Sequence, residues 1–324
     1  MNISDIGEFG FIRAIQDHTI VTPETVTVGI GDDGAVYKTT PGMEQVVVID
    51  TMIEGNHFII GKTATWHAVG YKAVASNLSD IAAMGATATQ LVLSTALIPS
   101  MTVADVKELY RGMKDICQVY GVNMVGGDTV TARESTVITV TVLGEIEKDK
   151  ALLRSGANVG DVVAISHTLG NSCAGLDVLL QQERGYEELV KHHQYPQPQL
   201  ALGRLLVSMN CHCANDISDG LASEANEIAK ASGVNLILDK DKIPFSPALE
   251  QWCAYAKKDR YRYAFGGGED YELVFTMAED DFYRLKKQYD DVTIIGSVQP
   301  GTGMVLLRDG DKESPLQPQG WTHF

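Results

Sequence analysis

Carboxylates set beside glycines are the side chains of this sequence with the most evident chemistry. Asp32 and Asp33 lie within the stretch 29–35 (GIGDDGA), directly after a short apolar run at 26–28. Glycine lets the backbone turn sharply and lets a ligand approach it closely. Two adjacent aspartates repel each other unless a cation lies between them. The stretch therefore predicts a turn that binds a cation.

Further aspartates occur in predicted turns that contain glycine or serine, most of them at strand ends or helix starts. The carboxylates that share this setting are Asp32, Asp33, Asp50, Asp80, Asp128, Asp216 and Asp219. Any one of them alone is typical of a cap or a turn, because Asp favours those places. Together they favour a shared site for Mg²⁺, which takes a few carboxylate oxygens and fills its shell with phosphate oxygens and water. A polyphosphate held by several Mg²⁺ ions would use this many acids.

The same glycines also match the dinucleotide fingerprint G-x-G-x-x-G, with Asp50 near the place of its ribose-binding acid. That fingerprint needs a helix whose N-terminus receives the pyrophosphate. Here only residues 35–45 separate the loop from the next apolar run at 46–49, a length that suits a hairpin. The paired aspartates would also face a polyanion. A metal-bridged phosphate site is favoured over a nicotinamide or flavin site, and no Walker A or protein-kinase motif is present.

Composition bounds the class of protein. The 324 residues are 44% hydrophobic and 21% charged, which is ordinary for a soluble globular protein of one or two domains. The formal charge of −16 argues against nonspecific binding to nucleic acid or to an anionic membrane surface. The start of the sequence lacks the pattern of a signal peptide, and no run approaches the ~20 apolar residues of a spanning helix.

Cysteine usage indicates a reducing compartment. The five cysteines are scattered and odd in number, so they predict free thiols and a cytoplasmic protein rather than a disulfide framework. The run 211–213 (CHC) suggests zinc, but its spacing matches no common zinc module.

Apolar periodicity predicts two mixed α/β domains, residues 1–148 and 149–324. The expected strands are 26–28, 46–49, 90–97, 123–125, 137–143, 162–166, 235–239, 271–276, 292–296 and 304–307. The expected helices are 65–75, 102–120, 171–180, 200–209, a helix beginning at 216–222, 247–256 and 280–288. Residues 186–198 are expected to form a loop or an irregular helix.

These elements give the acids expected places. Asp50 would end the strand 46–49, and Asp80 would cap a turn after the helix 65–75. Asp128 would follow the strand 123–125 in a loop, and Asp216 and Asp219 would begin a helix. The helix at 102–120 has a capping pair at its start and a glycine at its end.

Seven motifs occur in one order along nearly the whole chain. They are residues 29–35 (GIGDDGA), 50–58 (DTMIEGNHF), 77–85 (NLSDIAAMG), 126–129 (GGDT), 154–157 (RSGA), 217–221 (ISDGL) and 267–273 (GGEDYEL). In this set and order the sequence resembles the thiamine-monophosphate kinase family. The resemblance implies a two-domain α+β or α/β fold of the aminoimidazole ribonucleotide synthetase type, with the N-terminal sheets of two subunits pairing in a homodimer. It also implies that residues 1–148 bind ATP and Mg²⁺ and form the dimer.

The implied reaction is transfer of the γ-phosphoryl group of ATP to thiamine phosphate, giving thiamine diphosphate with the help of several Mg²⁺ ions. By their match to the family motifs, the implied metal ligands are Asp33, Asp50, Asp80, Asp128, Asp216 and Asp219, with Asp32 as an adjacent carboxylate. The implied ATP contacts are Gly127, Asp128, Arg154 and Ser218, of which Arg154 and Asp128 act in catalysis. The implied thiamine phosphate contacts are His57, Glu269 and Trp321. One departure is visible, because Val48 and Ile49 replace the small hydroxyl residues usual before Asp50.

Read without the resemblance, several of these residues have simpler interpretations. Arg154 could form a surface ion pair, Trp321 could pack the chain end, and Glu269 could be a solvated carboxylate at a strand start. Two other functions remain open from the residues: another ATP-dependent ligase or cyclase of the superfamily acting on a phosphorylated metabolite, and a non-catalytic protein that binds divalent cations.

Overall fold

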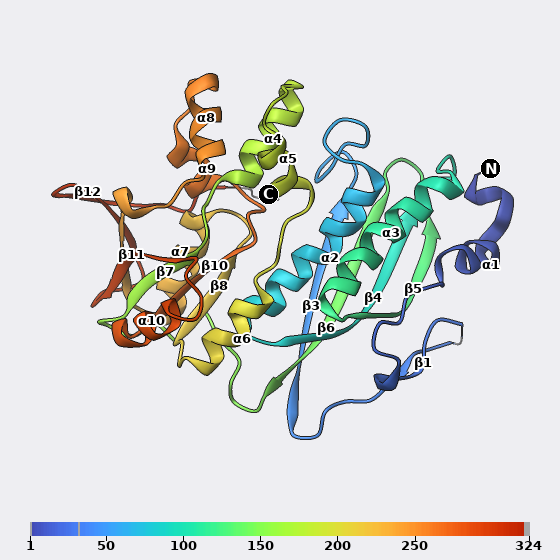
Figure 1. Ribbon diagram of the computed structural model, residues 1–324, viewed down its shortest axis with the longest axis horizontal. Coiled ribbons are helices and arrows are strands. Elements are labelled where there is room, and N and C mark those ends of the chain that lie inside the picture. The colour runs from blue at the N-terminus through green and yellow to red at the C-terminus, as the bar shows by residue number, and fades with distance from the viewer. Residues whose placement is uncertain (1, 32, 321–324) are drawn as a thin grey trace. The chain divides into compact units, whose positions relative to one another are not determined.

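The computed structural model describes residues 2–31 and 33–320, so the predictions for Asp32 and Trp321 lie outside the described residues. The chain divides into two compact units (Figure 1). The N-terminal unit contains residues up to Ile81 together with Thr87–Lys148, and the C-terminal unit contains Ala82–Ala86 and the chain from Asp149 onward.

A four-stranded sheet forms the centre of the N-terminal unit, in the order β3-β6-β4-β5. Its strands are β3 (Met43–Ile53), β4 (Thr87–Leu97), β5 (Asn123–Thr131) and β6 (Val137–Glu147). Strand β6 is antiparallel to both β3 and β4, whereas β4 and β5 are parallel. A parallel pair needs a crossover connection, and α3 (Val103–Tyr120) supplies it.

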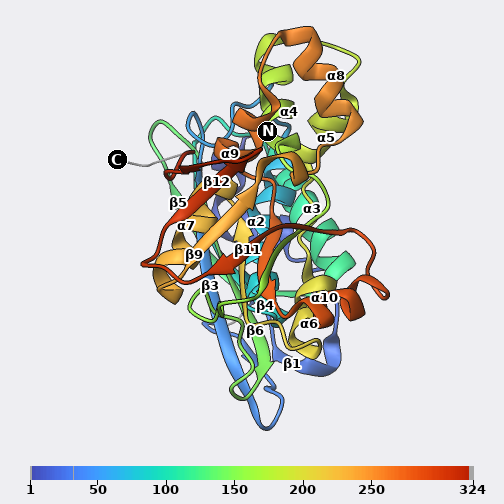
Figure 2. The ribbon, with the colours of Figure 1, turned by 90° about the vertical axis from the view of Figure 1, so that its left-hand side faces the viewer.

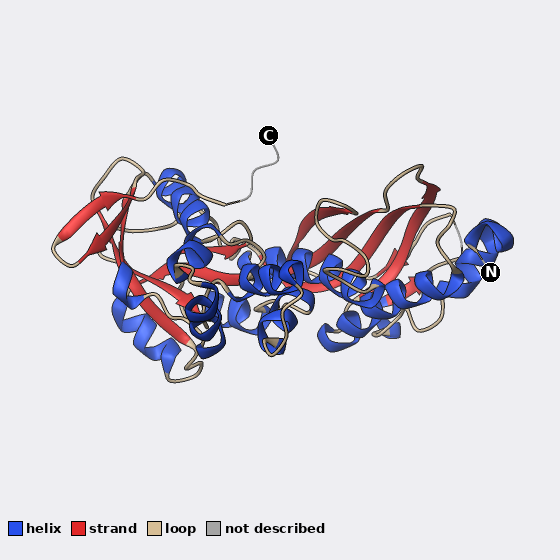
Figure 3. Ribbon diagram, turned by 90° about the horizontal axis from the view of Figure 1, so that it is seen from above, coloured by secondary structure: helices blue, strands red, loops and turns tan. Residues whose placement is uncertain are grey.

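Two helices, α2 (Trp66–Ala83) and α3, cover one face of this sheet (Figure 3). Alternate residues of β6 point toward them, and Ile138, Val140 and Val142 are almost fully buried. Helix α3 begins and ends as predicted. Its N-cap Thr102 and Asp105 form a capping box, and Gly121 ends the helix in the left-handed conformation.

The opposite face of the sheet carries exposed apolar side chains. On β3, Val47 and Ile49 are 61% and 63% exposed, and Val130 of β5 is 50% exposed. Ile53 lies on the same face of β3 because side chains two residues apart share a face. These four residues are called the open face below.

The N-terminal segment adds a helix and a small hairpin. Helix α1 (Ile3–Ile15), which the sequence analysis missed, packs on α3 through an edge-to-face contact of Phe11 with Tyr110. A single 3₁₀ turn, η1 (Pro23–Thr25), then leads into β1 (Val26–Val28), which pairs with β2 (Val36–Tyr37). The glycine-rich stretch is therefore the loop of a hairpin.

The C-terminal unit is built on a seven-stranded sheet in the order β13-β12-β9-β11-β7-β10-β8. The strands are β7 (Val162–Ser166), β8 (Cys213–Ile217), β9 (Asn235–Asp239), β10 (Glu272–Met277), β11 (Val292–Gln299), β12 (Val305–Asp309) and β13 (Lys312–Pro315). Most neighbours are antiparallel, and β12 with β9 is a parallel pair.

Both faces of the sheet are covered at β7, at β10 and at the edge strand β8, so these strands are buried along their whole length. One core holds Val274 against α7 (Leu221–Ser232). The other holds Leu273 and Phe275 against α6 (Leu200–Ser208) and α10 (Glu279–Lys286). Val274 faces one core and its neighbours Leu273 and Phe275 face the other, because successive side chains of a strand point to opposite faces of the sheet.

Four further helices of this unit surround a separate apolar cluster centred on Trp252. They are α4 (Asn171–Gln181), α5 (Glu187–Gln194), α8 (Pro247–Ala256) and α9 (Arg260–Gly266). Figure 2 shows α4, α5 and α8 gathered at one end of the unit. The 3₁₀ turn η2 (Lys240–Lys242) follows β9.

Several predicted elements need correction. The segment 186–198 contains the regular helix α5, and α9 occupies a stretch that was expected to be a loop. Strand β3 continues to Ile53 and pairs with β6 instead of with the first hairpin. In each case tertiary pairing or packing extends an element beyond its local sequence signal.

None of the helices in the described part of the chain has the length and apolar composition needed to cross a membrane. All five cysteines carry free thiols.

Candidate active site

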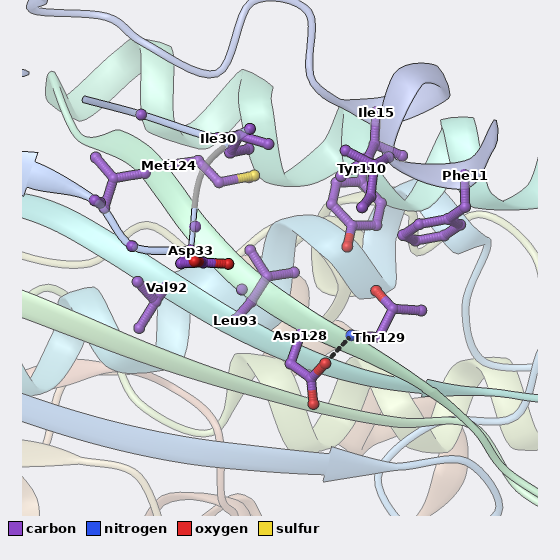
Figure 4. A pocket seen from close by; sticks show the side chains of 18 residues that line it. Phe11, Ile15, Ile30, Asp33, Val92, Leu93, Tyr110, Met124, Asp128 and Thr129 are labelled. Atoms are coloured by element: carbon purple, nitrogen blue, oxygen red, sulfur yellow. Dashed lines mark hydrogen bonds between the residues drawn. The ribbon is translucent and has the colours of Figure 1, made fainter. Parts of the chain in front are cut away.

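A cavity of about 770 Å³ lies in the N-terminal unit, beside the edge strand β5 (Figure 4). The glycine-rich hairpin loop contributes Gly29–Gly31 and Asp33–Ala35, and β5 contributes Met124–Thr129. Helices α1 and α3 close it with Phe11, Ile15 and Tyr110. Two motifs that are almost 100 residues apart in the sequence therefore line one cavity.

The cavity has a polar and an apolar part. Figure 4 shows Phe11, Ile15 and Tyr110 grouped together, with the carboxylates of Asp33 and Asp128 away from them. Burial raises the pKa of the Tyr110 hydroxyl to about 12, so this group stays protonated. A flat apolar ring suits the first part and a charged group with its counter-ions suits the second.

Gly127 is required where β5 runs closest to β4. A Cβ atom at this position would lie 2.2 Å from the carbonyl oxygen of Leu93, which no side chain tolerates. The glycine is therefore explained by strand packing, and it also keeps the backbone accessible next to Asp128. The expected loop at residues 126–129 is wrong, because these residues form the middle of β5.

Asp50 lies inside β3 instead of at a strand end, which corrects the prediction. Burial raises the pKa of its carboxyl, whereas a hydrogen bond from Ser76 and the nearby His57 lower it. His57 is held by its Nδ1, which accepts the backbone N–H of Ile53 at 3.0 Å. Asp80 lies one turn beyond Ser76 within α2, so the prediction that it caps a turn is also wrong.

Asp50 and Asp128 fall on opposite faces of the sheet. The register places Asp50 in one row with Val140, Leu93 and Gly127. In that row Val140 and Leu93 are buried under the helices and Asp50 is half-buried, whereas Asp128 belongs to the next row and is exposed. The N-terminal acids thus form two groups: Asp33 with Asp128 at the cavity, and Asp50 with Ser76, His57 and α2 on the helix-covered side.

In the C-terminal unit, the 217–219 and 267–271 motifs meet at one end of the sheet. Asp216 is part of β8, and the loop before α7 consists of Ser218, Asp219 and Gly220, so the expectation that Asp216 begins a helix is wrong. The backbone N–H of Glu269 donates to the Ser218 carbonyl at 2.7 Å. The Glu269 carboxylate lies 3.4 Å from Nδ1 of His193.

Two polar residues of this group escaped the sequence analysis. Glu224 of α7 is 5% exposed, and burial, Asp216 and Asp219 raise its pKa to about 7. Asn215 of β8 is 3% exposed and accepts a hydrogen bond from Nε of Arg154 at 2.9 Å. The only signal was their spacing around the motif at 217–221, which does not reveal burial. Arg154 itself is exposed.

Comparisons with known proteins identify the family. Residues 31–146 match the AIR synthase related protein, N-terminal domain, and residues 158–308 match its C-terminal domain. The thiamine-monophosphate kinase of Bacillus subtilis (strain 168) is 37% identical over 98% of this chain and 99% of its own. The chain belongs to the thiamine-monophosphate kinase family.

Solved structures agree with this assignment. The thiamine-monophosphate kinase of Stenotrophomonas maltophilia K279a has a TM-score of 0.83 and 31% identity over 95% of this chain and 97% of its own. AaThiL complexed with AMPPCP and TMP has a TM-score of 0.79 and 31% identity over 100% of this chain and 99% of that one. The family resemblance and the two-domain aminoimidazole ribonucleotide synthetase fold predicted from the motifs are therefore confirmed.

The donor atoms of the predicted metal ligands are of the type that Mg²⁺ binds. Every metal ligand predicted from the motifs is an aspartate, and Mg²⁺ prefers such hard oxygen donors. Within residues 2–31 and 33–320, no three acids, histidines or cysteines are grouped so as to enclose a metal ion by themselves. Mg²⁺ in proteins is usually bound by one or two carboxylates plus phosphate oxygens and water.

Proposed function

We propose that this protein is an enzyme that transfers the γ-phosphoryl group of ATP to thiamine phosphate, giving thiamine diphosphate and ADP. The observation that carries the proposal is the relation to thiamine-monophosphate kinases over the full chain, with 37% identity to the Bacillus subtilis enzyme. The relative AaThiL binds AMPPCP and TMP together. These two ligands correspond in chemical class to the two substrates proposed here.

ATP binds with its phosphates toward Gly127 and Asp128. The apolar part of the same cavity, formed by Phe11, Ile15 and Tyr110, suits the flat adenine ring. Because Gly127 has no side chain, phosphate oxygens reach the backbone of β5. Arg154 and Ser218 are the other proposed ATP contacts, and Arg154 supplies a fixed positive charge to the transferred group.

Several Mg²⁺ ions are held by the aspartates at the motif positions, Asp32, Asp33, Asp50, Asp80, Asp128, Asp216 and Asp219. When bound, Mg²⁺ offsets the charge of the phosphate oxygens and of these acids. The support is the donor chemistry together with the overall charge of −16, which would otherwise repel two anionic substrates.

The acceptor explains why the reaction needs no catalytic base from the chain. A phosphate monoester has its second pKa near ~6 and is largely ionised at neutral pH, so its oxygen can attack without losing a proton. The new bond joins this oxygen to the γ-phosphorus, and the bond from that phosphorus to the β,γ-bridging oxygen breaks to release ADP. The side chains then have only to align the two anions and balance their charge.

Thiamine phosphate is bound by His57, Glu269 and Trp321. Glu269 has a left-handed backbone and a nearby buried histidine, His193, both of which fix its position. It is suited to accept a hydrogen bond from the aminopyrimidine. Trp321 offers a ring face to the thiazolium cation. Trp321→Ala should raise KM for thiamine phosphate with little change for ATP, and the reverse pattern would contradict this assignment.

The protein acts as a homodimer in the cytoplasm. The open face of the N-terminal sheet supports the dimer, because exposed Val47, Ile49 and Val130 are better covered by a second copy than by water. Free thiols at all five cysteines are in keeping with a reducing compartment.

Product analysis tests the function directly. The protein is mixed with Mg-ATP and thiamine phosphate, and the products are separated and identified by mass. Thiamine diphosphate and ADP in equal amounts are the expected result. ATP consumption only with another phosphorylated metabolite would favour a ligase or cyclase, and no turnover with any of them would favour a cation-binding protein.

A further inference from the structure

A line of hydrogen bonds joins Arg154 to the loop of Ser218 and Asp219. Nε of Arg154 donates to Oδ1 of Asn215 at 2.9 Å, and Nδ2 of Asn215 donates to Oε2 of Glu224. The other oxygen of Glu224 accepts the backbone N–H of Asp219 at 3.3 Å and the Ser218 hydroxyl at 3.4 Å. The residues that link the proposed ATP contacts are thus Asn215 and Glu224, for which no role has been given so far.

The two linking residues are buried and come from regular elements. Asn215 is 3% exposed within β8, and Glu224 is 5% exposed in the first turn of α7. Arg154, in contrast, lies exposed in the segment before β7. A long, exposed arginine side chain has considerable rotamer freedom. The hydrogen bond from its Nε to Asn215, which is fixed in a buried strand, reduces the rotamer freedom of the Arg154 side chain.

Chemistry fixes which way the Asn215 amide faces. Arginine has only donors, so the amide oxygen must face Arg154. An ionised or a backbone-bonded glutamate offers an acceptor, so the amide NH₂ must face Glu224. The bond to Asn215 uses the Nε–H of the guanidinium, and the two terminal NH₂ groups are the ones that bind phosphate oxygens in pairs.

The backbone of Arg154 is also held in place. Its carbonyl oxygen accepts the Ser232 hydroxyl at 2.9 Å and lies 3.3 Å from the Cys213 sulfur. Two residues on, a Cβ atom at Gly156 would lie 1.8 Å from the His212 carbonyl oxygen, so only glycine allows this close approach. Main chain and side chain of Arg154 are thus both tied to the start of β8 and to the end of α7.

We infer that Asn215 is a positioning residue, which Glu224 holds in turn, and that it sets the orientation of the Arg154 guanidinium toward the phosphates. This inference rests on the proposed function of Arg154. A neutral amide is suited to the task because it aligns the guanidinium without cancelling its charge. An aspartate in its place would neutralise Arg154 and would add a carboxylate beside Asp216 and Glu224, where acids already repel each other.

The test combines Asn215→Ala with Arg154→Ala in a double-mutant cycle. Asn215→Ala alone should lower kcat roughly 100-fold, because a small misplacement of a catalytic group costs about that much, with KM for thiamine phosphate little changed. In the Arg154→Ala background the same substitution should have almost no further effect on kcat. Independent, multiplicative losses would overturn the inference.

Asn215→Asp keeps the shape of the side chain, so it tests the positioning role if Asn215→Ala fails to fold. It should also lower kcat, and this loss too should vanish in the Arg154→Ala background. Full activity of Asn215→Asp, with an unchanged thermal unfolding curve, would contradict the need for a neutral partner.

Asn226 offers a matched control in the same unit. It is 6% exposed, and its amide donates to the backbone carbonyls of Ala222 and Leu316. Asn226→Ala should lower stability but leave kcat near the wild-type value. An inactive wild type would refute the proposed function itself. Full activity of Arg154→Ala would refute the role of Arg154, whereas additivity in the cycle would refute only the role of Asn215.

Discussion

The acids of the N-terminal cavity and those of β8 and α7 in the C-terminal unit differ in how they are held. Asp33 and Asp128 are exposed, on a hairpin loop and on an edge strand. Asp216 and Glu224 are 3% and 5% exposed, and Asn215 links Glu224 to Arg154 by hydrogen bonds. One set lies open to solvent, and the other is embedded in the fold.

The difference suits the two sets to separate tasks in the phosphoryl transfer proposed above. Exposed carboxylates can exchange a bound water molecule for a metal ion, so the first set is suited to bind metal ions from solution. Burial raises the pKa of the Glu224 carboxyl to about 7, and repulsion by Asp216 and Asp219 adds to the effect. The second set is suited to hold fixed positions, and its charge calls for a cation. Changes in the two sets should therefore affect activity and stability in different proportions.

Asp128→Asn should give the largest effect on activity and almost none on stability. It removes one proposed metal ligand at the cavity, and losses of roughly 10²–10³-fold in kcat are typical when a fixed electrostatic contact is lost. Because the side chain is exposed, the thermal unfolding curve should stay unchanged. Steady-state kinetics at saturating Mg²⁺ measure the change in kcat, and a thermal unfolding curve measures the change in stability. The matched control is Asp311→Asn in the exposed turn between β12 and β13, and near-normal turnover of Asp128→Asn would contradict the ligand role.

Asn123→Ala should affect mainly stability, although it belongs to the same strand. The Asn123 side chain is fully buried and accepts the backbone N–H groups of Val21 and Thr22, both at 2.7 Å. It also donates to the hydroxyls of Thr22 and Thr25 at 2.6 and 3.1 Å. Its loss leaves several buried groups unsatisfied and should cost about 3 kcal/mol of unfolding free energy.

The same substitution should raise KM for ATP, since these bonds anchor the segment that leads into β1 and the glycine-rich loop. Denaturant unfolding and nucleotide titration measure the two effects. A destabilised variant with unchanged ATP affinity would show that the loop holds its place without this anchor.

The contribution of Glu224 to the free energy of unfolding should decrease as the pH rises. The pKa of this carboxyl is about 7 in the native protein against an ordinary 4.5, so the native state binds more protons between these values. The contribution is thus fully present below about pH 4.5 and is lost as the pH rises to about 7. Its size is on the order of 1–3 kcal/mol.

Asp216→Asn removes one of the charges that raise this pKa and should flatten the slope. Mg²⁺ should flatten it in the wild type as well. Urea titrations across this pH range, with and without MgCl₂, measure the slopes. A steeper slope for Asp216→Asn would refute the buried-acid interpretation.

A helix or strand was predictable where its signal lies in the local sequence. The periodicity of 162–166 and of 247–256 reproduces β7 and α8 residue for residue. The motifs also located the family and, through it, the two-domain fold. The extension of α2 to Ala83 and of β5 to Thr131 was missed, because Ser-Asp and Gly-Gly-Asp are cap and turn signals that packing overrides.

The site was less predictable than the elements. Glycines and acids close in sequence suggested one shared metal site, yet the strand register puts Asp50 and Asp128 on opposite faces of a sheet. Register depends on pairing partners that are distant in sequence. Likewise, Tyr110 and Asn215 have no local signature, since they matter only through a cavity and a buried network formed by several elements.

Thr102→Ala should give the smallest effect of these substitutions. It tests whether the N-terminal unit can be destabilised without changing the function of its exposed acids. Thr102 caps α3: its hydroxyl accepts the backbone N–H of Asp105 at 3.1 Å, and the Asp105 carboxylate accepts the N–H of Thr102 at 3.0 Å. Losing the cap should cost about 1 kcal/mol of unfolding free energy. The change lies at the start of α3, whereas Tyr110 lines the cavity from within the helix, so kcat should stay at the wild-type value. Thr102→Ser, which keeps the hydroxyl, should restore the lost stability. A loss of activity in Thr102→Ala as large as that in Asp128→Asn would mean that metal binding by the exposed acids depends on the stability of the helix beneath them.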